Sequence, residues 1–63
     1  MTKKEIVETI KKMDNAKVVN LWNKYVGEKC YPHENVQSFT DWNDAKSPID
    51  IDILVDWLFE KEN

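Results

Sequence analysis

The stretch of sequence that decides the fold runs from Ser47 to Lys61 and reads SPIDIDILVDWLFEK. Serine at an N-cap followed by proline at the first helical position is a strong start for a helix. Residues 49–53, however, alternate isoleucine with aspartate at the period of a strand. Apolar residues then continue without alternation for about two more turns, and this length favours a helix.

Two starting points for this helix remain open. Either it begins at Pro48, or a short extended piece leads into a helix that is capped by Asp52. Both versions leave residues 53–61 helical, and we expect the helix over about residues 50–61.

The predicted helix has an unusually wide apolar face. At about 100° per residue, its apolar side chains cover about two thirds of the circumference, and only a narrow stripe is acidic. The acidic stripe contains Asp52, Asp56 and Glu60, at positions i, i+4 and i+8. We favour a central helix wrapped by the other helices, although part of the apolar face, with Trp57 or Phe59, could instead be exposed for a partner.

The N-terminal half begins with a helix start signal. Thr2 and Glu5 have the spacing of a capping box, and apolar residues at helical spacing follow, so we expect a helix over about residues 3–13. Asp14 and Asn15 interrupt this pattern and offer a new N-cap.

A second helix is predicted over residues 15–26. One of its faces is apolar and contains Val18, Leu21, Trp22 and Tyr25. Gly27 is the only glycine of the chain and stands where a left-handed residue would end this helix.

The region between residues 28 and 47 has no long periodic pattern. Val36, Phe39 and Trp42 are separated by three residues each, which predicts a short helical turn over about residues 36–43. The sequence therefore indicates an all-α fold, a compact three- to four-helix arrangement in which residues 1–63 form a single small domain.

The two halves of the sequence carry opposite net charges. Residues 1–33 carry seven lysines and four acids, a net charge of +3, whereas residues 34–63 carry two lysines and eight acids, a net charge of −6. There is no arginine, the usual residue for bidentate phosphate and base contacts, so direct nucleic-acid binding is not expected.

No apolar run is long enough to span a membrane, and no signal peptide is visible. Together with a lone cysteine, this predicts a soluble cytoplasmic protein.

Cys30 and His33 are the strongest candidates for chemistry, and they form a C-x-x-H pair. As a zinc half-site the pair needs further ligands, but the chain has no other cysteine or histidine. No oxyanion loop accompanies the pair, and a single glycine excludes a glycine-rich phosphate loop. We therefore expect no enzyme activity, no cofactor and no metal.

Two motifs carry a resemblance to known proteins. The run Leu21-Trp22-Asn23-x-Tyr25 and the ending Ser47-Pro48-Ile49-Asp50-Ile51-Asp52 resemble those of small acidic, largely uncharacterised proteins of phages and mobile elements of gut bacteria. The resemblance covers most of residues 14–62. Those proteins are longer and have an aromatic, glycine-containing middle segment that this chain lacks. The resemblance implies a phage or mobile-element protein that acts on host machinery, and it supplies no catalytic residues.

Charge and resemblance together predict a non-enzymatic module that binds a host protein, with inhibition of host defence as one outcome. Asp52, Asp56 and Glu60 are the expected electrostatic contacts, and Trp42 and Phe59 are the expected anchors. Because a dense acidic face can imitate a phosphate backbone, a nucleic-acid-binding protein is one kind of partner. The alternative is a structural protein that forms a homodimer through its C-terminal helix.

Overall fold

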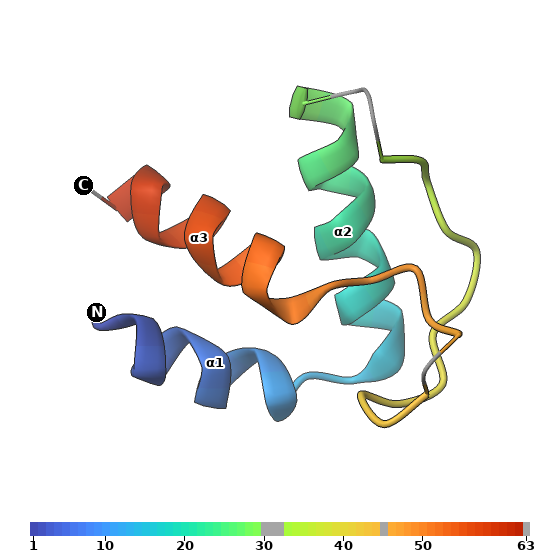
Figure 1. Ribbon diagram of the computed structural model, residues 1–63, viewed down its shortest axis with the longest axis horizontal. Helices are drawn as coiled ribbons and strands as arrows, with labels where there is room; N and C mark the ends of the chain where they lie inside the picture. Colours follow the sequence, from blue (N-terminus) through green and yellow to red (C-terminus); the bar gives the residue numbers. More distant parts are fainter. Residues whose placement is uncertain (30–32, 45, 63) are drawn as a thin grey trace.

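The computed structural model describes residues 1–29, 33–44 and 46–62, and its regular structure in these ranges is three α-helices without a strand. They are α1 (Lys3–Lys11), α2 (Asn15–Lys29) and α3 (Ile51–Glu62). Figure 1 shows α1 and α3 side by side in opposite directions, with both chain ends on the same side, while α2 crosses near their other end. The predicted all-α fold of three to four helices is confirmed, with three.

Helix α1 begins with the predicted capping box. The Thr2 hydroxyl oxygen accepts a hydrogen bond from the Glu5 backbone N–H (3.2 Å), and a Glu5 carboxylate oxygen accepts one from the Thr2 backbone N–H (2.9 Å). These hydrogen bonds with Thr2, chiefly that from its backbone, hold the pKa of Glu5 below its ordinary value. The helix ends at Lys11, and Lys12 is its C-cap, so it is shorter than the expected residues 3–13.

Helix α2 begins at the expected residue but continues through Gly27 to Lys29, so the predicted stop at the glycine is wrong. Glycine inside a helix costs only about 1 kcal/mol relative to alanine, and contacts elsewhere outweigh that cost. The additional turn places Glu28 where its carboxylate accepts hydrogen bonds from Trp57 Nε1 (2.7 Å) and Lys61 Nζ (2.8 Å).

Helix α3 begins between the two starting points that the sequence left open. Asp50 caps it, because its Oδ1 accepts a hydrogen bond from the Asp52 backbone N–H (2.9 Å). The Ser47 hydroxyl accepts from the Ile49 backbone N–H (3.3 Å) and so stabilises the turn before the helix. Neither Ser47 nor Asp52 is therefore the N-cap, although the expected range of 50–61 differs by only one residue at each end.

The apolar side of α3 closes the core between the other two helices, as the favoured interpretation predicted. Leu54 is fully buried, and Trp57 is 5% exposed, so Trp57 is not available to a partner. The buried apolar residues of the described chain are Ile6, Ile10, Val18, Trp22, Tyr25, Val26, Phe39, Ile49, Leu54, Val55 and Trp57. Within the described ranges, Met1 is the one exposed large apolar residue.

The helical turn predicted over residues 36–43 is absent from that described segment, where the only turn with a backbone hydrogen bond runs from Asp41 to Asp44 (3.3 Å). Side chains of α2 bind the backbone of this region instead. The Asn23 amide accepts from the Val36 backbone N–H (2.8 Å) and donates to its carbonyl (3.0 Å). Because these backbone groups are paired with α2, the segment does not form a helix of its own.

Candidate functional site

The three acidic residues singled out on α3 lie together on its solvent side. Asp52, Asp56 and Glu60 are all exposed, and we call them the acidic face. Asp56 forms an ion pair with Lys3 of α1 (Nζ to Oδ1, 3.0 Å). With the described residues, Asp52 and Glu60 form no ion pair. The acidic face therefore presents two carboxylates to solvent and shares a third with α1.

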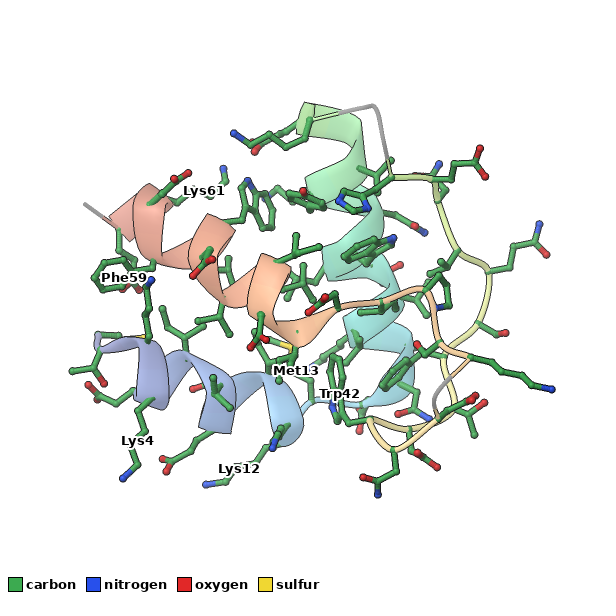
Figure 2. All side chains as sticks on the ribbon, viewed as in Figure 1. Lys4, Lys12, Met13, Trp42, Phe59 and Lys61 are labelled. Carbon is green, nitrogen blue, oxygen red and sulfur yellow. The ribbon has the colours of Figure 1, made fainter. Side chains whose placement is uncertain are left out.

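Phe59 borders the acidic face and is half-buried. Its side chain packs against the core, and the Lys3 ammonium lies over its ring, 5.3 Å from the centroid. In Figure 2, Phe59 lies between α3 and the beginning of α1. Its partial burial leaves only part of the ring for contact with another protein.

Trp42, the other predicted anchor, lies elsewhere. It is half-buried and packs against Phe39, with ring centroids 4.5 Å apart and planes at 56°. In Figure 2 it lies toward the end of α1 that is remote from Phe59. The structure thus brings Phe59 to the acidic face but places the two aromatic anchors at opposite ends of α1.

A second charged network joins α2 to α3, and the sequence pattern did not indicate it. Glu28 binds both Trp57 and Lys61, and the Lys61 ammonium also lies 5.0 Å from the centroid of the Trp57 ring. The hydrogen bonds from Lys61 and then from Trp57 hold the pKa of the Glu28 carboxyl below its ordinary value. No periodicity links Glu28 to α3, so only the folded chain shows this network.

Figure 2 shows Lys4 and Lys12 pointing away from the molecule. Lys3 differs from them, because its ammonium contacts both Asp56 and Phe59. Lys3 was not among the predicted site residues, although it contacts two of them, Asp56 and Phe59. Only the antiparallel packing of α1 on α3 brings it there.

An apolar hollow of about 180 Å³ lies between α1 and α3. Lys61 and Glu62 line this hollow, and both form ion pairs. Lys61 pairs with Glu28, and Glu62 pairs with the Met1 amine (3.3 Å). The hollow is lined by Met1, Ile6, Thr9, Ile10, Met13, Leu58, Lys61 and Glu62.

The C-x-x-H pair is only half described. Cys30 lies outside the described residues, while the His33 ring packs against Trp22 and Tyr25, with centroids 5.3 Å and 5.6 Å away. Across the ranges that the structure describes, no three histidine, cysteine or acidic side chains are grouped so that they could hold a metal ion. None of the three described helices is long and apolar enough to cross a membrane.

Comparisons with protein-family models, with curated proteins and with solved structures found no match to this chain. The resemblance to small acidic phage proteins therefore stays a prediction. A function must be argued from the geometry and charge of the chain's own residues.

Proposed function

We propose that this chain is a non-enzymatic protein-binding module whose acidic face docks on a basic surface of a partner protein. One observation carries the proposal. The three carboxylates of Asp52, Asp56 and Glu60 lie exposed on one side of α3, while the apolar side of the same helix is used inside the molecule.

The physical basis is electrostatic. Residues 34–63 carry a net charge of −6, from eight acids against two lysines, and three of these acids lie exposed on one side of α3. We expect a negative field over this side of α3. Such a field steers a basic partner toward the surface and raises the association rate. Because exposed charges are screened within about 8 Å at physiological ionic strength, the binding weakens as salt is added.

The aromatic anchors take secondary roles. Phe59 lies beside the acidic face, so its ring contacts the partner at the edge of that face. Trp42 lies near the other end of α1, so it contacts only a partner that covers more of the surface than the acidic face. Both are half-buried, so truncating either one affects folding as well as binding.

The partner we propose is a host protein met in the cytoplasm by a phage or mobile-element product, as the sequence resemblance implies. A protein that binds nucleic acid fits best, because its basic surface is complementary to a row of carboxylates. Inhibition of a host defence protein is one outcome of such docking. The proposal includes no cofactor and no direct contact with nucleic acid.

The alternative, a homodimer formed through α3, has less support. The apolar side chains that such a dimer would pair are packed inside one molecule, with Leu54, Val55 and Trp57 all buried. A dimer through this face would require the core to open, whereas docking of the acidic face leaves the core intact.

Capture from host lysate with a matched pair of variants tests the proposal. The first neutralises the acidic face (D52N/D56N/E60Q), and the control neutralises three exposed acids outside α3 (E34Q/D41N/D44N). We expect the wild type and the control to retain the same partner at low salt, and the first variant to lose it. A partner that the first variant retains equally, or capture of no partner at all, would contradict the proposal.

A further inference from the structure

The acidic face contains a position that is already occupied by a cation. The Lys3 ammonium lies 3.0 Å from Asp56 Oδ1 and 5.3 Å from the centroid of the Phe59 ring. A carboxylate and an aromatic ring both attract an ammonium, the ring through its quadrupole, and they act here on the same group. We call the Asp56 carboxylate and the Phe59 ring the cation seat.

We infer that the cation seat binds a basic side chain of the partner and that Lys3 is an intramolecular competitor for it. This inference rests on the proposed function and names the chemistry of the docked group, an ammonium or a guanidinium. Lys3 itself shows that the seat accepts a primary ammonium on a flexible stem. A partner must displace Lys3 to occupy the seat, so Lys3 reduces the apparent affinity.

Lys3 is suited to being displaced. Its side chain is 57% exposed and that of Asp56 is 65% exposed, so water and a partner both reach the ion pair. An exposed ion pair of this kind is weak, and the lysine stem rotates freely once it is released. The start of α1 depends on the Thr2–Glu5 capping box rather than on the Lys3 ammonium, so the helix persists when Lys3 leaves the seat.

The geometry of the seat favours arginine over lysine in the partner. A guanidinium is planar, so it can stack on the Phe59 ring while it donates two hydrogen bonds to the Asp56 carboxylate. An ammonium makes the same contacts only as a point charge. The preferred partner surface therefore presents arginine at the position that Lys3 occupies.

The neighbouring lysine provides a matched control. Lys4 points away from the molecule in Figure 2, whereas Lys3 lies in the seat. Lys3→Met and Lys4→Met remove the same charge from adjacent positions of α1, so general attraction for a basic ligand rises equally in both. Only Lys3→Met removes the ammonium that lies in the seat.

Titration with a blocked hexa-arginine peptide at low salt, followed by backbone amide NMR, measures the effect. We expect the peptide to bind Lys3→Met about two- to tenfold more tightly than Lys4→Met, with the largest shifts around Asp56 and Phe59. In an Asp56→Asn background, the two lysine variants should bind with equal affinity. Equal affinities with Asp56 intact would overturn the inference.

The same titration separates this inference from the proposed function. If Lys3→Met and Lys4→Met bind alike while D52N/E60Q weakens the peptide, the role of Lys3 is wrong and the acidic face stands. If the peptide binds neither the wild type nor Lys3→Met, or shifts no residue of α3, both proposals are overturned.

Discussion

Helices α1 and α3 are held together differently from α2 and the segment 33–44. The α1–α3 contact is made of apolar side chains, and exposed ion pairs such as Lys3 with Asp56 lie at its edge. The segment 33–44 is bound to α2 by hydrogen bonds from α2 side chains, chiefly those of Asn23 to Val36. The α1–α3 contact therefore depends mainly on buried apolar area, whereas the segment 33–44 adds individual hydrogen bonds to the burial of Phe39.

The difference predicts how each region responds to change. Burial of apolar area is non-directional and spread over many residues, so the α1–α3 contact tolerates changes at its charged edge. A hydrogen bond from a partly buried amide has one geometry, and its loss leaves backbone groups of the segment without a partner. The segment 33–44 should therefore loosen locally when a single α2 side chain is removed.

The largest expected effect comes from Trp22, which joins the hydrophobic core to the segment 33–44. Its ring is 1% exposed in the core, and its Nε1 donates to the Glu34 carbonyl (2.9 Å). Trp22→Ala should cost about 3–5 kcal/mol, which is most of the stability that a domain of this size has. Chemical denaturation followed by circular dichroism measures the loss. A variant as stable as the wild type would show that this ring does not join the two regions.

A smaller and more local effect is expected at Asn23. Asn23→Ala removes both hydrogen bonds to Val36 and should cost about 1–3 kcal/mol, with faster amide hydrogen exchange at Val36. Asn20 is the control, since it is an exposed asparagine of the same helix, and Asn20→Ala should change stability by less than about 0.5 kcal/mol. Equal losses of stability in Asn23→Ala and Asn20→Ala would show that the hydrogen bonds to Val36 do not hold the segment 33–44 on α2.

The smallest effect is expected from pH, through Glu28. Hydrogen bonds from Lys61 and Trp57 lower the pKa of Glu28 from its ordinary value of 4.5. Because the folded-state pKa is depressed, the stabilisation is complete above the ordinary pKa and is lost as pH falls through the folded value. The melting temperature of the wild type should exceed that of Glu28→Gln at pH 7, and the difference should shrink as pH falls below 4.5. A difference that does not change with pH would contradict this role of the carboxylate.

The sequence predicted those parts of the fold that depend on residues close together in the chain. Apolar spacing predicted the three helices but also, wrongly, a helical turn over residues 36–43. The T-x-x-E pattern predicted the capping box of α1, and the i, i+4, i+8 acids predicted the exposed stripe of α3. Each of these signals depends on residues within a few positions of one another.

The remaining features depend on contacts between distant residues. The turn through Gly27 is stabilised by Glu28, whose partners Trp57 and Lys61 come from α3. The segment 33–44 follows α2 because Asn23 binds its backbone, and a side-chain-to-backbone bond has no period in a sequence. Lys3 reaches the candidate site only because α1 and α3 are antiparallel.

The central claim is that α3 keeps its buried apolar side within one molecule and meets other proteins through the acidic face and the adjoining Phe59 ring. Sedimentation equilibrium at high micromolar concentration, at low and high salt, tests this most directly. We predict a single species of 7.5 kDa under both conditions. A dimer that persists or strengthens in high salt would contradict the claim, because it would show that apolar surface, not the acidic face, is what the molecule presents.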